Sequence, residues 1–249
     1  SFLAASKTGG IAVPINFELP VEAVQTILND TQPRFLIVAS RFLELALLAS
    51  AGRPDIEIIA VGEHGTDNLS WNDVIREEKT SNPAYDMKDD DIVYLNYTSG
   101  STGNSKGAVT THAHICANTV AAVDALQMTH DDVHLCMFAP FAHPHEIFAR
   151  PLYLGGTMVL VENIYPKSLA HAISDNRVTC VMGLAPMYEN LLEVLEHKAY
   201  DLSSLRIPES GGMFTRLDLI ERFKQKLGVP IIPVWGSTET TGIALANRP

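Results

Sequence analysis

Apolar runs typical of buried strands alternate with helical patterns along most of this chain. This order favours an α/β fold, because parallel strands joined by helices require such an alternation. We expect strands at Ile11–Ile15, Phe35–Val38, Ile56–Val61, Ile92–Tyr97, Ala108–Thr110, Leu135–Ala139, Thr157–Val161, Val178–Val181, Leu205–Ile207 and Ile231–Val234. We expect helices at Pro20–Asn29, Arg41–Ala51, Trp71–Lys79, Lys167–Asn176, Met187–Glu196 and Leu217–Leu227, and one that Thr111 caps and that continues through Leu126.

Helical spacing also predicts which side chains face inward. In three of these helices they are Val24, Ile27 and Leu28; Leu43, Leu47 and Leu48; and Ile115, Thr119, Val123 and Leu126. Residues 62–91 are polar and rich in Pro, Gly and Asp, so we place a boundary there. The expected division is an N-terminal α/β segment at 1–91 and a nucleotide-binding α/β segment at 92–249.

Composition bounds the class of protein. The 249 residues are 46% apolar and 19% charged, which fits a globular domain with a sizeable core. A net charge of −11 without a basic cluster argues against nucleic acid as a partner. No apolar run approaches the ~20 residues of a membrane span. Three widely spaced cysteines form neither a metal spacing nor a disulfide framework, which favours a cytoplasmic location.

The most informative segment is Tyr94-Leu95-Asn96-Tyr97-Thr98-Ser99-Gly100-Ser101-Thr102-Gly103-Asn104-Ser105-Lys106-Gly107. An apolar run leads into glycines that expose backbone N–H groups, hydroxyls that add donors, and a lysine that adds positive charge. Such a loop suits a polyphosphate. A Ser/Gly surface turn is the commoner meaning of short Gly-rich stretches, but the preceding strand and the ordered donors favour the phosphate loop. The lysine position excludes a Walker P-loop, and no dinucleotide fingerprint is present.

This segment resembles the phosphate loop of the AMP-forming adenylate-forming superfamily, which includes acyl- and aryl-CoA synthetases and peptide-synthetase adenylation domains. The family form is Tyr-Thr-Ser-Gly-Ser/Thr-Thr-Gly-x-Pro-Lys-Gly, and this chain departs from it at Ser105, where proline is usual. The resemblance implies mixed, largely parallel β-sheets flanked by helices. It also implies that Thr98, Ser99, Gly100, Ser101, Thr102, Gly103 and Lys106 hold the phosphates of ATP.

A second segment, Val234-Trp235-Gly236-Ser237-Thr238-Glu239, follows an apolar strand and resembles the Tyr-Gly-x-Thr-Glu motif of the same family. The resemblance assigns Trp235 to adenine stacking, Thr238 to a phosphate contact and Glu239 to Mg²⁺, with Gly236 and Ser237 in the same nucleotide-binding stretch. A carboxylate is a hard oxygen ligand of the kind that magnesium prefers.

Two further segments complete the resemblance. Ser210-Gly211-Gly212-Met213 is similar to the Ser-Gly-Gly-Ala-Pro turn that lines the adenine and acyl sites, although Met213 and Phe214 replace Ala-Pro. Pro140-Phe141-Ala142-His143 resembles the Pro-Leu-Phe-His stretch whose histidine lies beside the carboxylate substrate. An isolated Gly-Gly turn or histidine is more often structural, so it is the order of the motifs that favours these functions.

Two His-x-His pairs, His112/His114 and His143/His145, suggest a second metal hypothesis. Zinc sites need three or four ligands with supporting spacing, and neither pair has such a set. We therefore expect no metal there.

The resemblance implies an enzyme, an AMP-forming acid–thiol ligase that activates a carboxylic acid with ATP and Mg²⁺ and passes the acyl group to coenzyme A. Lys106, Thr238, Glu239 and His143 are its expected catalytic residues. Ala142-His143 stands where peptide-synthetase domains carry an aspartate, which favours a non-amino acid substrate. Loading of a carrier protein and a non-catalytic nucleotide-binding module remain alternatives. The family's ribose-binding and lid motifs are not in this sequence, so we expect a fragment, inactive or very slow by itself, of a chain roughly twice as long.

Overall fold

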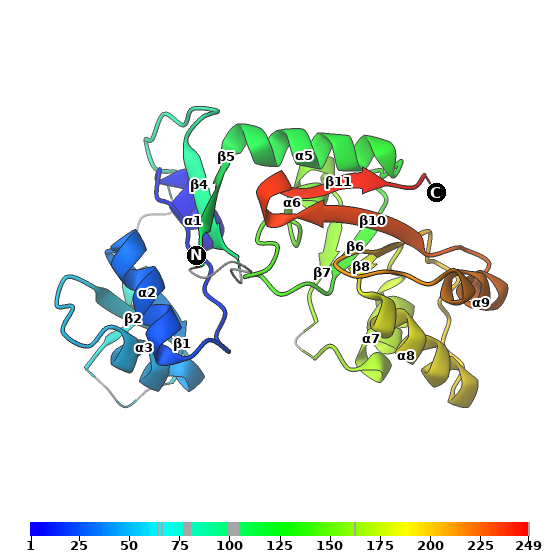
Figure 1. The fold of residues 1–249 in the computed structure, drawn as a ribbon, viewed down its shortest axis with the longest axis horizontal. Coiled ribbons are helices and arrows are strands. Elements are labelled where there is room, and N and C mark those ends of the chain that lie inside the picture. The colour runs from blue at the N-terminus through cyan, green and yellow to red at the C-terminus, as the bar shows by residue number, and fades with distance from the viewer. Residues whose placement is uncertain (64, 66, 77–80, 99–104, 162, 249) are drawn as a thin grey trace. The chain divides into compact units, whose positions relative to one another are not determined.

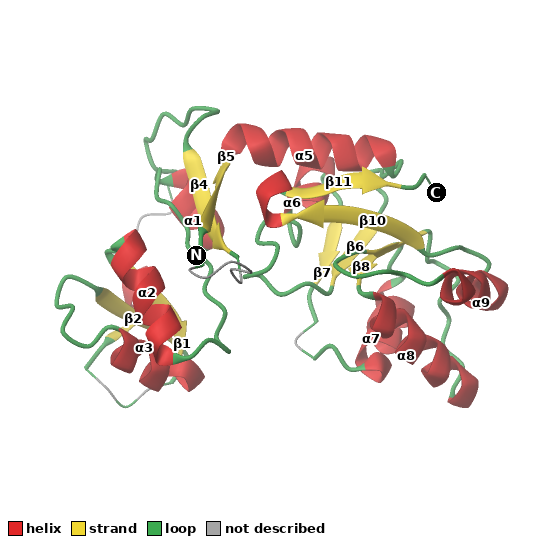
Figure 2. Ribbon diagram, viewed as in Figure 1, coloured by secondary structure: helices red, strands yellow, loops and turns green. Residues whose placement is uncertain are grey.

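The computed structural model describes residues 1–249 except 64, 66, 77–80, 99–104, 162 and 249 (Figure 1). The chain forms two compact units, Ser1–Met87 and Lys88–Pro249. Both contain parallel strands and helices, so the expected α/β class is confirmed (Figure 2). The assignment of nucleotide binding to residues 92–249 stays a prediction.

The first unit has a three-stranded parallel sheet in the order β1-β2-β3. Its strands are β1 (Phe35–Ala39), β2 (Glu57–Val61) and β3 (Leu69–Ser70), and its helices are α1 (Phe2–Lys7), α2 (Val21–Thr31), α3 (Leu43–Ala49) and α4 (Trp71–Arg76), with a 3-10 turn, η1 (Ser40–Phe42). Val24 and Leu28 of α2 pack against Ala49 and Ile56 to form its main core.

Two expectations for the first unit are wrong. Ile11–Ile15 is not a strand: Ala12 makes an isolated bridge, Ile11 is exposed, and Pro14 has no N–H to donate to a ladder. In α3, Leu47 and Leu48 are exposed. Because this helix begins only at Leu43, after the η1 turn, its inner face is completed instead by two alanines at helical spacing, Ala46 and Ala49.

The second unit is built on a six-stranded sheet in the order β11-β10-β9-β8-β6-β7 and a separate β4–β5 hairpin. The strands are β4 (Ile92–Tyr97), β5 (Gly107–Thr111), β6 (Val133–Cys136), β7 (Thr157–Val159), β8 (Cys180–Gly183), β9 (Ile207–Ser210), β10 (Ile232–Ser237) and β11 (Gly242–Ala246). The helices are α5 (His112–Ala125), α6 (Ala149–Leu154), α7 (Pro166–Asn176), α8 (Ala185–His197) and α9 (Leu217–Leu227), with a 3-10 turn, η2 (Thr238–Thr240).

Helices cover both faces of this sheet, with α5 and α6 on one side and α7, α8 and α9 on the other (Figure 2). Successive residues of a strand face opposite sides, and β8 illustrates this. Val181 joins the core with Leu169 and Tyr188, whereas Cys180 joins a core with Leu126 at the end of α5. Alternate apolar residues therefore pack against helices on the two faces.

The expected elements of this unit exist, although the strand expected at Leu205–Ile207 begins only at Ile207, and two further elements were not anticipated. Thr111 caps α5 as predicted, because its hydroxyl accepts from the N–H of His114 at 3.3 Å. The strand expected at Leu135–Ala139 ends at Cys136, since Ala139 instead accepts from the N–H groups of Ala142 and His143 in a turn. The unanticipated elements are α6 and the antiparallel strand β11.

Candidate active site

Three of the four predicted motifs lie at one edge of the six-stranded sheet. Strands β6, β8, β9 and β10 are parallel, so their carboxyl ends meet at the same edge. His143 follows β6, and Gly211-Gly212 follows β9. Trp235 through Glu239 form the end of β10 and the η2 turn after it. Topology therefore gathers residues that are far apart in the sequence.

The phosphate-loop motif is closed by an antiparallel hairpin. Tyr97 of β4 pairs with Gly107 of β5, and the N–H of Thr98 donates to the carbonyl of Lys106 at 3.0 Å. The Ser105 hydroxyl donates to the carbonyl of Thr98. Serine at the usual proline position thus ties the two ends of the loop together. The Lys106 side chain is exposed. Ser99, Gly100, Ser101, Thr102 and Gly103 lie outside the described residues.

The backbone of the Gly211-Gly212 turn lies so close to neighbouring side chains that it leaves little room for side chains of its own. A Cβ atom at Gly211 would lie 2.9 Å from Val234, and Gly212 has a φ of +74°, which side chains disfavour. Phe138 lies 3.9 Å from the Cβ position of either glycine, and its ring centroid is 5.1 Å from that of His143. Phe138, which the sequence analysis did not single out, therefore joins the glycine turn to His143. Met213 is 50% exposed at the end of this turn.

The end of β10 and the η2 turn after it expose the Trp235 ring and the Glu239 carboxylate. The Ser237 N–H donates to the Thr240 hydroxyl at 2.9 Å, so η2 is capped. Hydrogen bonds from its own backbone N–H and from Ser237 lower the pKa of Glu239, which keeps this exposed carboxyl ionised at neutral pH. The Trp235 side chain is 57% exposed, which leaves its ring available for stacking.

Gly236 permits this conformation. A Cβ atom there would lie 2.0 Å from the carbonyl oxygen of Gly242 on the paired strand β11. Replacing Gly236 with alanine should therefore lower the free energy of unfolding by about 1–3 kcal/mol, because the two strands must move apart. Gly65→Ala is the control, since its Cβ would meet nothing within 4 Å. Equal chemical denaturation midpoints for the two variants would contradict the expectation.

A hollow of about 320 Å³ lies beside Glu239. Thr240 and Thr241 line it next to Glu239, Val109 contributes from β5, and His114, Ala117 and Asn118 line it from α5. Its volume falls in the range of small-ligand sites. Strand β5 of the hairpin and the η2 carboxylate therefore lie beside a common space.

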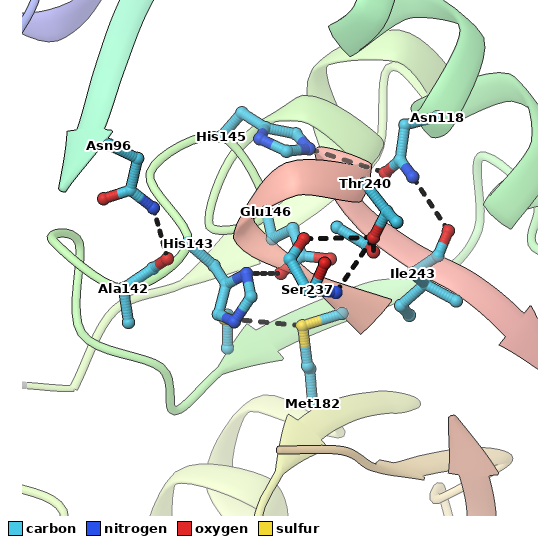
Figure 3. A network of polar contacts seen from close by, with 12 residues as sticks. Asn96, Asn118, Ala142, His143, His145, Glu146, Met182, Ser237, Thr240 and Ile243 are labelled. Atoms are coloured by element: carbon cyan, nitrogen blue, oxygen red, sulfur yellow. Dashed lines mark hydrogen bonds and ion pairs between the residues drawn. The ribbon is translucent and has the colours of Figure 1, made fainter. Parts of the chain in front are cut away.

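The loop after β6 carries a buried ionic cluster, and Figure 3 shows the contact of its Glu146 with His143. His143 Nδ1 lies 3.1 Å from Glu146 Oε2, and Glu146 Oε1 lies 3.5 Å from Arg150 Nη2. Arg150 Nη1 donates to both carboxylate oxygens of Glu209 at 2.9 Å. Burial raises the pKa of Glu209, and Arg150 acts in the opposite direction. We call Glu146, Arg150 and Glu209 the carboxylate–guanidinium cluster.

A second set of polar contacts fixes the same loop to its neighbours. Asn96 of β4 donates to the carbonyl of Ala142 at 2.8 Å, which joins the hairpin to the loop that carries His143. The buried His145 lies 3.0 Å from the Tyr94 hydroxyl and 3.5 Å from Asn118 Oδ1. Burial first, then the positive charge of Arg150, lowers the pKa of His145 to about 3. His145 is therefore neutral at physiological pH.

Most of these supporting residues were not predicted from the sequence. They are Phe138, Asn96, Asn118, His145 as a structural residue, and the three members of the carboxylate–guanidinium cluster. One signal was available: Glu146 and Arg150 are charged residues four apart in an apolar stretch, which is unusual for an exposed loop.

Among the described residues, no helix has the length and apolar character needed to cross a membrane. The described part of the chain also holds no group of three or more His, Cys, Asp or Glu side chains suited to a metal ion. Cys116, Cys136 and Cys180 are free thiols. The cytoplasmic location stays a prediction.

The fold and the site define an α/β protein whose motif residues gather at the carboxyl edge of a largely parallel sheet. The chain belongs to the AMP-binding enzyme family, whose sequence model matches residues 1–249. This confirms the family expected from the motifs.

Named relatives fall in the same family. Medium-chain fatty-acid–CoA ligase of Escherichia coli (strain K12) is 29% identical over 258 aligned positions, which cover 99% of this chain and 45% of that protein. Feruloyl-CoA synthase of Amycolatopsis sp is 29% identical over 100% of this chain and 48% of that protein. The crystal structure of the anthranilate CoA ligase AuaEII with anthranoyl-AMP matches with a TM-score of 0.94 and 31% identity, covering 100% of this chain and 49% of that one. The chain spans about half the length of these relatives.

Proposed function

We propose that this chain is the nucleotide- and acid-binding part of an AMP-forming acid–thiol ligase. In the proposed reaction a carboxylate attacks the α-phosphate of ATP to give an acyl-adenylate and pyrophosphate, and a thiol then takes the acyl group. The observation that carries the proposal is the convergence of His143, Gly211-Gly212 and Trp235–Glu239 on one sheet edge in a member of the AMP-binding family. CoA ligases among the relatives favour coenzyme A as the thiol.

The proposed roles are those that the resemblance to the family's motifs implies. Thr98 to Gly103 and Lys106 hold the β- and γ-phosphates. Trp235 stacks on adenine, and the backbone of Gly211 and Gly212 lines the adenosine site. Binding of this kind accelerates the reaction mainly through positioning and charge neutralisation.

Magnesium fits the residues present. Glu239 is exposed and ionised, and a single carboxylate together with phosphate oxygens and waters is a usual Mg²⁺ environment. Thr238 adds a hydroxyl beside it. The ion would neutralise phosphate charge, while His143 lies beside the carboxylate of the acid. Without an aspartate near His143 to pair with an ammonium group, a non-amino carboxylic acid is the proposed substrate class.

The test is carboxylate-dependent ATP–pyrophosphate exchange by the full-length protein with propanoate, octanoate, ferulate and benzoate. Exchange with one acid supports the proposal and identifies the substrate class. Subsequent thioester formation with coenzyme A, or its absence, distinguishes coenzyme A from a carrier-protein acceptor. No exchange with any acid, despite magnesium–ATP binding, would favour a nucleotide-binding module instead.

Lys106→Ala and Glu239→Gln should each lower kcat/KM for exchange by about 100-fold, since the first removes a positive charge from the phosphates and the second removes the carboxylate proposed to hold Mg²⁺. The matched controls are Lys224→Ala and Glu221→Gln on the exposed surface of α9, which should leave exchange unchanged. Equal rates for site and control variants would contradict the proposed roles.

A further inference from the structure

Glu146 connects His143 to the interior of the second unit. The Glu146 side chain is only 3% exposed, and it lies between the partly exposed His143 and the buried Arg150. Its contacts resemble those of groups that orient a histidine rather than those of groups that touch a ligand, because the side chain is buried and its Oε1 atom is closed off from solvent.

The contact with Glu146 determines which nitrogen of His143 carries hydrogen. An ionised carboxylate can only accept hydrogen bonds, so at 3.1 Å the Nδ1 atom is the donor. In the neutral ring, Nε2 is then an acceptor, and in the charged ring it is a second donor. The ring also packs against Phe138 at a centroid distance of 5.1 Å. The contact with Glu146 and the packing against Phe138 therefore limit the tautomer and the rotation of the ring.

Glu146 also forms an ion pair with a buried guanidinium, that of Arg150. Arg150 is 4% exposed and bridges Glu146 to Glu209, which lies on β9 two residues before Gly211. The backbone carbonyl of Glu209 accepts from the buried Tyr188 hydroxyl at 2.7 Å. The cluster thus joins the His143 loop to the strand that ends in the glycine turn.

Charge favours the same arrangement. The two carboxyl groups of Glu146 and Glu209 share the single guanidinium of Arg150. A hydrogen-bond donor is therefore favoured over an acceptor on the open side of Glu146, and the Nδ1–H of His143 is such a donor.

We propose that Glu146 is a positioning residue, which fixes the tautomer and orientation of His143 for contact with the carboxylate of the substrate. This inference rests on the proposed function, in which His143 lies beside that carboxylate. Glu146 does not touch substrate and acts only through His143.

The first test is the ¹⁵N spectrum of histidine-labelled full-length protein, with the His143 signals assigned by their loss in His143→Asn. We expect hydrogen on Nδ1 in the native protein and a shift toward the Nε2–H tautomer in Glu146→Gln. A native His143 that carries hydrogen only on Nε2 would overturn the proposal, whatever the enzyme's activity.

The second test is kinetic and uses each acid of the panel that supports exchange. Glu146→Gln should raise the KM for the acid about 10-fold, as is typical when a group that orients a histidine is changed, and leave the KM for ATP within about twofold. Glu146→Gln leaves Arg150 paired with Glu209, so the fold should persist, as checked by circular dichroism. Glu189→Gln, an exposed ion-pair partner of Arg222, is the matched control.

A double-mutant cycle separates the possible outcomes. If Glu146 acts through His143, Glu146→Gln has no further effect on the acid KM in a His143→Asn background. Equal losses in both backgrounds, or equal rises in both KM values, would overturn the positioning role. An unchanged acid KM in His143→Asn alone would instead refute the role proposed for His143. The absence of exchange with every acid would refute the proposed function. The ¹⁵N spectrum would then still show whether Glu146 fixes the tautomer of His143.

Discussion

Replacing Arg150 with methionine is expected to lower the free energy of unfolding by about 3–5 kcal/mol, the usual cost of leaving buried charges without their partner. Arg150 is the guanidinium of the carboxylate–guanidinium cluster and is 4% exposed. Without it, Glu146 and Glu209 face each other in a region of low polarity. One of them must then take up a proton or the surrounding structure must admit water.

The double variant Arg150→Met/Glu209→Gln identifies the cause of this loss. It removes one carboxylate together with the guanidinium, so it should recover part of the stability lost in the single variant. A pure packing defect at residue 150 would not be relieved in this way. Arg222→Met is the control, because its ion pair with Glu189 is exposed and should contribute less than about 1 kcal/mol. Urea denaturation measures all three variants, and similar losses for Arg150→Met and Arg222→Met would contradict the argument.

The placement of the motifs could be predicted from sequence because it follows from local patterns. Alternating strands and helices imply parallel strands, and parallel strands bring their carboxyl ends together. His143, Gly211-Gly212 and Trp235–Glu239 each follow an apolar run, so their convergence needed no knowledge of side-chain contacts. The cap at Thr111 was predictable for the same reason, since it depends on residues three apart.

The support behind these residues could not be predicted. Arg150 and Glu209 are 59 residues apart, and nothing local indicates that two charged side chains pair in the interior. Charged residues are usually exposed, so pattern analysis places them in solvent. The prediction of the inner face of α3 was wrong because the η1 turn delays the start of the helix. Strand β11 was not predicted because its residues give only a short apolar signal after a turn.

Stability should fall between pH 7 and pH 5, and two buried histidines are the expected cause. Burial lowers the pKa of His134 to about 4 and, with the charge of Arg150, that of His145 to about 3. In the unfolded chain both should titrate near 6.5, so below that pH the unfolded state binds more protons than the folded state. Stability therefore rises with pH in this range: the contribution is fully present above 6.5 and is lost as the pH falls toward 4. Each histidine should contribute about 2 kcal/mol between pH 5 and pH 7.

Substitution separates these two histidines from the other titrating groups. His134→Gln and His145→Gln should each remove about half of the loss in unfolding free energy between pH 7 and pH 5, measured by urea denaturation. The exposed His130 is the control, and His130→Gln should keep the full loss. Asp132 does not interfere, because Arg206 and Thr179 overcome the effect of its burial and hold its pKa at about 2, so its contribution is lost only below pH 4. An unchanged pH dependence in both glutamine variants would mean that His134 and His145 are protonated in the folded protein. The assignment of a neutral His145 beside Tyr94 and Asn118 would then be wrong. The interior contacts that fix the loop carrying His143 would be wrong with it.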